Sequence, residues 1–268
     1  MATGSTEEAK LLGAWPSPFV MRPRIALNLK GVGYEFLEEA FGIKSDLLLK
    51  SNPVYKKIPV LIHNGKPVCE SMIIVEYVDE VWADDGKPRI LPSDPYDRAI
   101  ARFWAYYIDD KFFPSVRGLS TAQTEEAKAE VVSQVFAGLQ LLEGAFMNCS
   151  KGKGFFGGDT IGYLDIALGC YLGWIRVIEK SEGIKFLDED KTPLLAGWAE
   201  RFCADAAVKE VMPEIEKLME FAQALRAKMQ AAAAAAAAVQ YYYSDAPCRR
   251  AQKTGPGTSG WCRAPSLV

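Results

Sequence analysis

Ser17 is the residue whose type and neighbours are best suited to chemistry. It stands in Trp15-Pro16-Ser17-Pro18, between a short apolar run and a longer one with helical spacing. A serine hydroxyl at the start of a helix can donate its hydrogen to an anion, and the helix N-terminus adds a favourable potential. Ser17 is not expected to ionise or to attack a substrate, because no base is in evidence to take its proton. The simpler alternative is an ordinary helix N-cap.

A second polar pair, Glu70-Ser71, opens another segment of helical periodicity that begins at Met72. Free backbone N–H groups at a helix start and a serine hydroxyl can hold a carboxylate, while a glutamate can pair with an ammonium group. The pair therefore suits a ligand that carries both charges. The plainer alternative is a capping pair, and both roles can hold at once.

The cysteines and the single histidine speak against two other kinds of chemistry. Six cysteines form no CxxC pair and show no metal-ligand spacing, so no metal site is expected. A Ser-His-Asp or Cys-His mechanism would need His63 as its base. His63 adjoins the Asn64-Gly65 turn and is expected to be an exposed strand-end residue, while Cys69 is expected to be inert core. Neither is assigned a role.

Composition bounds the class of protein. The 268 residues are 49% hydrophobic and 24% charged, which is typical of a globular protein, and the length favours two domains. A net charge of −3 and a pI near 5.5 give no general attraction to nucleic acid or anionic lipid, so a small-molecule partner is expected. Because residues 1–10 lack an apolar run and no stretch is long enough for a membrane span, we expect a cytoplasmic protein.

The first 83 residues must form the scaffold that positions Ser17 and Ser71. Asn64-Gly65 between two apolar segments is a strong β-hairpin signal. The order of elements is βαβ, then α, then ββα, which predicts a thioredoxin-like domain with a mixed four-stranded sheet over residues 1–83. The expected elements are strand 10–14, helix 18–31, strand 34–38, helix 45–50, strand 58–62, strand 67–69 and helix 72–82.

The remainder reads as helical. Residues 84–95, with Asp-rich turns and prolines, are expected to form a linker to an all-α domain over 96–239. Asp165, three residues after Gly162, predicts a capped helix start. The tail, 240–268, follows an eight-alanine run and is expected to be disordered, with docking of a partner by its tyrosines or Cys248 as the alternative. The expected helices are 96–117, 125–146, 164–180, 193–203 and 213–229.

Several blocks of this sequence resemble the plant tau-class glutathione transferases. Trp15-Pro16-Ser17-Pro18-Phe19, followed by Met21 to Leu27, is similar to the amino-terminal signature of that class. Ser51 to Leu61, with Asn64-Gly65-Lys66-Pro67 and Glu70-Ser71, resembles its glutathione-binding block. Ala101 to Trp104 and Phe156 to Asp159 are similar to landmarks of its helical domain. The resemblance covers about residues 10–229.

This resemblance implies an enzyme that conjugates the thiolate of glutathione to hydrophobic electrophiles in detoxification and the stress response. Glutathione would be a co-substrate, with no other cofactor, and Ser17 would be the catalytic hydrogen-bond donor to its sulfur. A free thiol with a pKa of about 8.5 is only a few per cent ionised at pH 7, so such a donor is needed. Glutathione peroxidase activity is left open. Relatives are homodimers, and the same is expected here.

The resemblance also assigns residues to the two substrates. Glu70 would pair with the γ-glutamyl ammonium and Ser71 with its carboxylate, while the backbone of Ile58, before a cis-proline, would pair with the cysteinyl portion. Lys44 and Lys57 would reach the glycyl carboxylate. Against these readings, a lysine is usually a solvated surface charge. The expected residues of the acceptor pocket are the aromatic and apolar Trp15, Phe19, Tyr107, Trp174, Phe221 and Leu225, each of which could instead be ordinary core.

Three positions depart from the pattern of the class. Ala14 stands where many relatives carry phenylalanine, which is expected to widen the acceptor pocket. Tyr106 replaces a common aspartate, so a polar contribution to the glutathione site is expected to be missing or altered. Pro23 within the first helix removes a backbone hydrogen bond and predicts a bend.

Two other functions remain as alternatives. One is a carrier that binds hydrophobic ligands in the acceptor pocket without turnover. The other is a glutathione-dependent thiol oxidoreductase, which would form a mixed disulfide through a cysteine at the position of Ser17. The serine itself argues against that second alternative.

Overall fold

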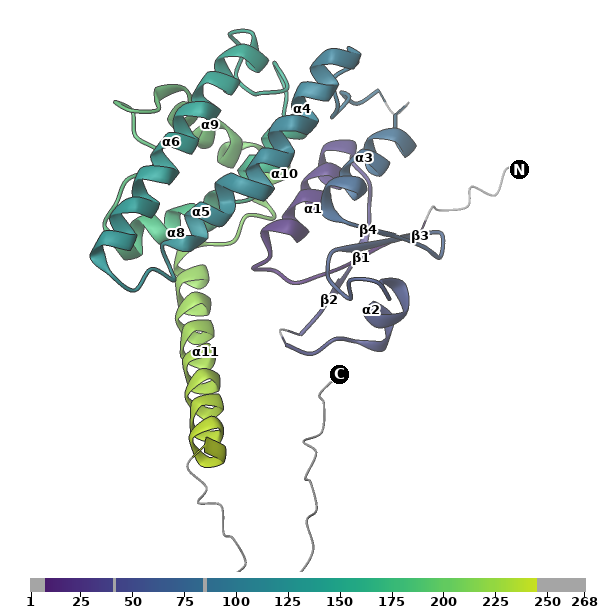
Figure 1. Cartoon of the computed structure of the whole chain (residues 1–268). Helices are drawn as coiled ribbons and strands as arrows, with labels where there is room; N and C mark the ends of the chain where they lie inside the picture. The colour runs from purple at the N-terminus through teal and green to yellow at the C-terminus, as the bar shows by residue number, and fades with distance from the viewer. Residues whose placement is uncertain (1–7, 41, 84–85, 245–268) are drawn as a thin grey trace, which may run out of the picture. The chain divides into compact units, whose positions relative to one another are not determined.

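The computed structural model describes residues 8–40, 42–83 and 86–244. Residues up to Ala222 form one compact unit, and those from Gln223 onward form a second that is described by itself. The last helix, α11 (Ile215–Ser244), passes from one to the other. The tail predicted to be disordered therefore begins as helix at residue 240, and its part from 245 onward lies outside the described residues (Figure 1).

A mixed four-stranded sheet confirms the predicted fold of the first part. Its order is β2-β1-β3-β4, with β1 parallel to β2 and antiparallel to β3, and β3 antiparallel to β4. The hairpin turn is made by Asn64 (φ 49°) and Gly65 (φ 76°), and two left-handed residues in succession are what a two-residue hairpin of matching twist requires. The strands are β1 (Ala9–Gly13), β2 (Glu35–Glu38), β3 (Val60–His63) and β4 (Lys66–Cys69).

Helices cover both faces of this sheet. Leu11 joins the large core that contains helices α1 (Pro18–Lys30) and α3 (Ser71–Val81). Leu12, the next residue, faces the other way and packs with Leu48 of the short helix α2 (Asp46–Ser51). Helix α1 continues without interruption through Pro23, and the bend expected there stays a prediction.

His63 differs from its expected position, because it is buried rather than exposed. Its side chain is only 6% accessible, its Nδ1 lies 2.8 Å from the Tyr77 hydroxyl, and its ring packs on Trp82. The turn residue Asn64 is exposed, but the strand position before it faces α3. His63 is therefore part of the core between the sheet and this helix.

The rest of the unit is helical, as predicted, with two corrections to the helix bounds. The single helix expected over 96–117 is divided by a π-helical turn, η1. The helix expected over 164–180 is two helices, α7 and α8, separated at Cys170 and Tyr171. The segments are α4 (Pro95–Tyr107), η1 (Ile108–Phe112), α5 (Phe113–Gly118), α6 (Glu125–Ser150), α7 (Tyr163–Gly169), α8 (Leu172–Glu182), α9 (Pro193–Ala204) and α10 (Ala206–Lys209).

The break between α7 and α8 has a tertiary cause. The N–H of Tyr171 donates to the carbonyl of Leu168, three residues back, and not to the carbonyl of Ala167. That freed carbonyl instead accepts from Nη2 of Arg22 at 2.9 Å. An arginine from α1 thus takes the place of a helical hydrogen bond, which sequence periodicity cannot show.

Asp165 confirms the predicted start of α7 and does more than the sequence indicated. Its carboxylate accepts from the backbone of Gly162, as a capping acid should, at 2.8 Å. It also accepts from the N–H groups of Phe156 and Gly157 and from Nε1 of Trp198. Burial raises the pKa of Asp165 to about 6, although these four donors all favour the carboxylate.

Helices α7 and α9 approach so closely that only glycine fits at Gly169. A Cβ there would lie 2.3 Å from the ring of Phe202. We expect Gly169→Ala to lower the free energy of unfolding by about 1–3 kcal/mol through overpacking. Gly144→Ala, in α6, would place its methyl group with no other atom within 4 Å and should instead raise the free energy of unfolding by about 0.5–1 kcal/mol. Urea titration of both variants checks this, and equal midpoints would contradict the close approach.

A buried ion pair fixes the chain after α3. Lys30 of α1 and Asp79 of α3 lie 2.7 Å apart with fully buried side chains. The Asp79 carboxylate also accepts from the backbone of Ile90 and Leu91, beyond the end of α3.

No helix in the described ranges combines the length and apolar character of a membrane span.

Candidate functional site

Ser17 caps α1 at the end of the turn that follows β1. Its backbone is extended, its N–H donates to the carbonyl of Ala14 at 3.1 Å, and its Oγ accepts from Val20 N at a long 3.4 Å. The first turn of α1 has no acidic residue that would offset the positive end of the helix. The half-buried hydroxyl therefore keeps its hydrogen for an external acceptor beside a favourable potential.

Glu70 and Ser71 begin α3 without capping it. Glu70 has a left-handed backbone (φ 72°), its side chain is exposed, and it makes no side-chain cap bond. The capping role weighed for it is therefore not what the structure shows. Ser71 is buried, and its Oγ accepts from Nη1 of Arg22 at 3.1 Å. A hydroxyl that accepts from a cation on one side has its hydrogen available for an anion on the other.

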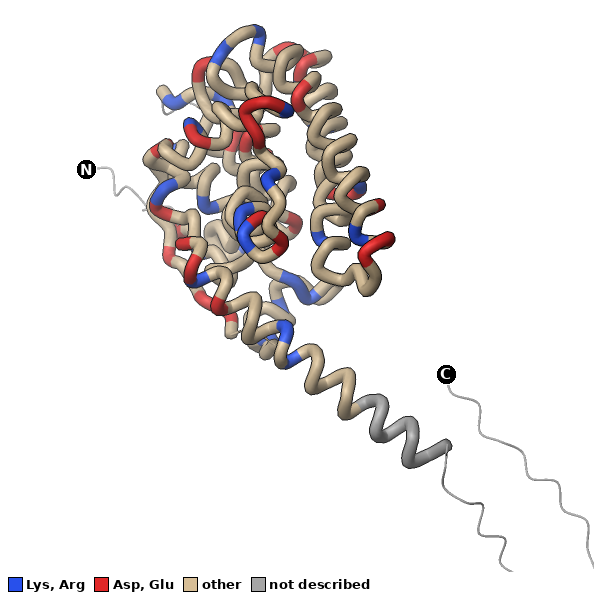
Figure 2. The backbone as a smooth tube through the Cα atoms, turned by 90° about the vertical axis from the view of Figure 1, so that its left-hand side faces the viewer, with Lys and Arg blue, Asp and Glu red and all other residues tan. Residues whose placement is uncertain are grey.

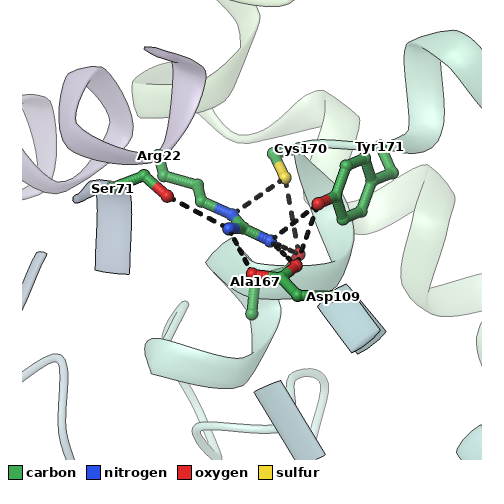
Figure 3. A network of polar contacts seen from close by, with 6 residues as sticks. All are labelled: Arg22, Ser71, Asp109, Ala167, Cys170 and Tyr171. Carbon is green, nitrogen blue, oxygen red and sulfur yellow. Dashed lines mark hydrogen bonds and ion pairs between the residues drawn. The ribbon is translucent and has the colours of Figure 1, made fainter. Parts of the chain in front are cut away.

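Arg22 connects this helix start to the helical part of the molecule (Figure 3). Its side chain is fully buried, and its two terminal nitrogens bind the two carboxylate oxygens of Asp109 at 2.8 and 2.5 Å. Such a fork-to-fork pair fixes both position and orientation. The other acceptors around the guanidinium are the Ser71 hydroxyl, the Ala167 carbonyl, the Tyr171 hydroxyl and the Cys170 sulfur.

The groups around Arg22 leave the arginine as the one cation of this network. Burial raises the pKa of the Cys170 thiol to about 11, and burial likewise raises the pKa of Tyr171, so both are neutral at pH 7. Asp109, on the π-helical turn η1, is the balancing carboxylate. Neither Arg22 nor Asp109 was among the residues predicted to have a role. The available signal was an arginine between Met21 and Ile25 within the apolar residues of this helix.

The remaining residues proposed for glutathione, Lys44, Lys57 and Ile58, lie in the loops before α2 and β3. The Ile58–Pro59 peptide bond is cis, as the resemblance implied. Ile58 is half-buried just before β3, and the Lys57 carbonyl accepts from the Asn52 side chain. The side chains of Lys44 and Lys57 are exposed, and in the described part of the chain neither forms a hydrogen bond or an ion pair.

A cavity of about 400 Å³ opens beside the turn that carries Ser17. The ring of Trp15 packs edge to face against that of Phe221, with 5.5 Å between the ring centres. The ring centre of Trp174 lies 6.3 Å from that of the same phenylalanine. Trp174 also donates from Nε1 to the Pro16 carbonyl at 2.8 Å. The lining comes from the end of β1, the end of β2 and the start of α11, namely Ala14, Trp15, Pro16, Glu38, Glu39, Ala40 and Phe221.

Four residues proposed for the acceptor pocket are not in this lining, and Trp174 is one of them, although its ring contacts Phe221. Phe19 packs edge-on against Tyr171 and is 38% exposed. Tyr107 is half-buried beside Trp104, and burial raises the pKa of its hydroxyl. Leu225 lies in the second unit, so it is not placed relative to the cavity. The structure thus brings Trp15, Trp174 and Phe221 together, whereas Phe19 and Tyr107 make ring contacts with other residues.

The structure also shows where two of the residues that depart from the class pattern, Ala14 and Tyr106, are located. Ala14 lines the cavity, as a widened pocket requires, and is itself buried. Tyr106 is 70% exposed and takes no part in the Arg22 network, where the carboxylate comes from Asp109 three residues later. No group of three or more His, Cys, Asp or Glu side chains in the described residues could hold a metal ion.

Comparison with known proteins gives consistent results along the chain. Residues 7–80 match the glutathione S-transferase N-terminal domain, and residues 125–201 match the glutathione S-transferase C-terminal domain. Glutathione S-transferases U17 and U18 of Arabidopsis thaliana are each 63% identical over 227 residues, which are 85% of this chain and 100% of each relative.

Two solved structures are similar in both fold and sequence. The tau-class glutathione S-transferase of mango, Mangifera indica, has a TM-score of 0.79 at 67% identity and covers 81% of this chain and 98% of its own. Rice glutathione S-transferase 1, solved in complex with glutathione, has a TM-score of 0.75 at 37% identity and covers 84% of this chain and 99% of its own.

Proposed function

The chain belongs to the glutathione S-transferase family, in its tau class, and from that premise we propose that Ser17 activates the thiol of glutathione for transfer to hydrophobic electrophiles. The observation that carries the proposal is the Ser17 turn itself. The hydroxyl caps α1 only through a long contact and stands at a helix end with no acidic residue in its first turn. The residues just before it, Trp15 and Pro16, line a cavity together with Phe221.

The start of α3 supports a place for the γ-glutamyl end of glutathione. Ser71 can donate to the carboxylate while Arg22, held behind it at 3.1 Å, supplies positive potential, and Glu70 is free to pair with the ammonium. Rice glutathione S-transferase 1, which binds glutathione, is 37% identical. The backbone of Ile58 would then pair with the cysteinyl portion, and the exposed side chains of Lys57 and Lys44 would reach the glycyl carboxylate.

The energy required of Ser17 is modest. Lowering the thiol pKa by two units raises the thiolate from a few per cent to about three quarters at pH 7, at about 1.4 kcal/mol for each unit. One hydrogen bond to a charged sulfur together with a helix N-terminus can supply this amount. The sulfur then attacks an electrophile held in the cavity beside the turn, where Trp15 and Phe221 provide an apolar surface and Trp174 packs against Phe221.

Turnover distinguishes this proposal from the carrier. We expect the purified full chain to form the glutathione conjugate of 1-chloro-2,4-dinitrobenzene, followed by absorbance and verified by mass spectrometry. A cumene hydroperoxide assay tests peroxidase activity by the same thiolate. Saturable binding of a fluorescent apolar ligand, with no conjugate from any of several electrophiles, would favour the carrier instead. The serine at position 17 leaves the thiol oxidoreductase without its attacking cysteine.

Homodimerisation is part of the same proposal. Several large apolar side chains of the sheet domain and of α4 are strongly exposed in the single chain, among them Val54 at 78%, Ile73 at 57% and Phe103 at 58%. Burial of such side chains against a second copy would remove them from water. Sedimentation at twice 29.5 kDa is expected, and sedimentation as a monomer would exclude the homodimer.

We further propose that the enzyme acts in cytoplasmic detoxification and the stress response.

A further inference from the structure

The cavity beside Ser17 contains acidic residues that its proposed use for hydrophobic electrophiles does not explain. Glu38 and Glu39, at the end of β2, line it together with Trp15 and Phe221. We propose, on the basis of the function above, that Glu38 selects acceptors that carry a cationic group next to an apolar body. Glu38 is then a specificity-determining residue for the electrophile.

The two glutamates are not equivalent. The Glu39 carboxylate already binds the start of α2, because it accepts from the backbone N–H of Ser45 at 3.1 Å and from its hydroxyl at 2.6 Å. The Glu38 side chain is exposed at the cavity and, in the described ranges, forms no ion pair or hydrogen bond. Glu39 thus shapes the wall, whereas Glu38 has both carboxylate oxygens available to a ligand.

The aromatic side chains of the lining favour the same kind of ligand. A cation is attracted to the face of an indole or phenyl ring, in addition to any carboxylate nearby. The protein itself uses Trp15 in this way, since Nζ of Lys217 lies 4.4 Å from the centre of its ring. This lysine is also the nearby cation that would oppose a charged acceptor. Two carboxylates against one ammonium still leave a net negative charge at the cavity.

A matched set of electrophiles tests the proposal. Derivatives of 4-chloro-3-nitrobenzoic acid share one reacting carbon, and the methyl amide is neutral, whereas the 2-(dimethylamino)ethyl amide is cationic at pH 7. The measured quantity is the ratio of kcat/KM for the cationic amide to that for the neutral amide, with the full chain and saturating glutathione. We expect Glu38→Gln to lower this ratio by about three- to tenfold, and added salt to lower it in the native enzyme.

Two further variants separate the local charge from a general one. Glu35→Gln removes a carboxylate from the same strand that is 3.5 Å from Lys10 and outside the lining, so the ratio should stay as in the native enzyme. Lys217→Met should raise the ratio, because it removes the competing cation. An unchanged ratio in Glu38→Gln, with conjugation of the neutral amide still measurable, overturns this inference alone. Failure of the native enzyme to conjugate either amide, or any other electrophile, would instead count against the proposed function.

Discussion

Ser17→Ala is expected to remove the thiolate of bound glutathione and to lower kcat by about 100-fold, the usual loss when one donor to a developing anion is deleted. The native complex should show thiolate absorption in the ultraviolet with a midpoint well below 8.5, and the variant complex should not. Glutathione affinity should change much less, because Glu70 and Ser71 lie at the start of another helix, α3, where the contact of Ser71 with Arg22 does not involve Ser17.

The loss of the α1 cap must be distinguished from the loss of the donor. The Ser17 cap bond is long, at 3.4 Å, so its removal should cost little stability. Thr124→Ala is the matched control, since Thr124 caps α6 at 3.1 Å. The Thr124→Ala variant should be destabilised at least as much as Ser17→Ala, but it should keep full turnover. If the native protein and Ser17→Ala both bind glutathione without forming thiolate at neutral pH, the proposed mechanism is wrong and the carrier function is favoured.

Arg22→Met is expected to lower the free energy of unfolding by about 3–5 kcal/mol, the range found when one member of a buried ion pair is removed. The reason is that Asp109, Ser71 and the Ala167 carbonyl would lose a common donor inside the protein. Urea unfolding measures the change. Arg22→Lys should recover only part of it, because an ammonium group cannot reproduce the two-pronged contact with Asp109.

A surface ion pair provides the comparison for Arg22. Lys151 and Asp97 are 2.7 Å apart, but their side chains are 69% and 39% exposed. Lys151→Met should therefore cost less than about 1 kcal/mol. If Arg22→Met were no more costly than this control, the network of Figure 3 would not be a main support of the fold. Figure 2 shows that basic and acidic residues are both scattered along the backbone.

Local sequence signals predicted the parts of the fold that local physics decides. Asn64-Gly65 specified the hairpin, Ser17-Pro18 the start of α1 and Gly162 with Asp165 the start of α7, and the structure has each of them. Ser17 and the Glu70-Ser71 pair also stood out by residue type and position. Their roles toward glutathione stay predictions until binding and turnover are measured.

What the sequence did not predict depends on contacts between distant segments. The break at Cys170 and Tyr171 exists because Arg22, 145 residues before Ala167, takes over a helical carbonyl. His63 is buried because α3 returns over the sheet and Tyr77 meets the imidazole. The acidic lining of the cavity arises where the ends of two parallel strands meet the start of α11. None of these pairings leaves a periodic trace in the chain.

The hydrogen bond from Trp174 to the Pro16 carbonyl connects the helical domain to the residue just before Ser17 and restrains its position. In the proposed function, this contact therefore links acceptor recognition to thiol activation. An exchange of helical domains between related enzymes would import a new acceptor surface and, with it, a new restraint on the serine. Diversification of this fold by recombination should accordingly favour partners that keep a side-chain donor at the position of Trp174.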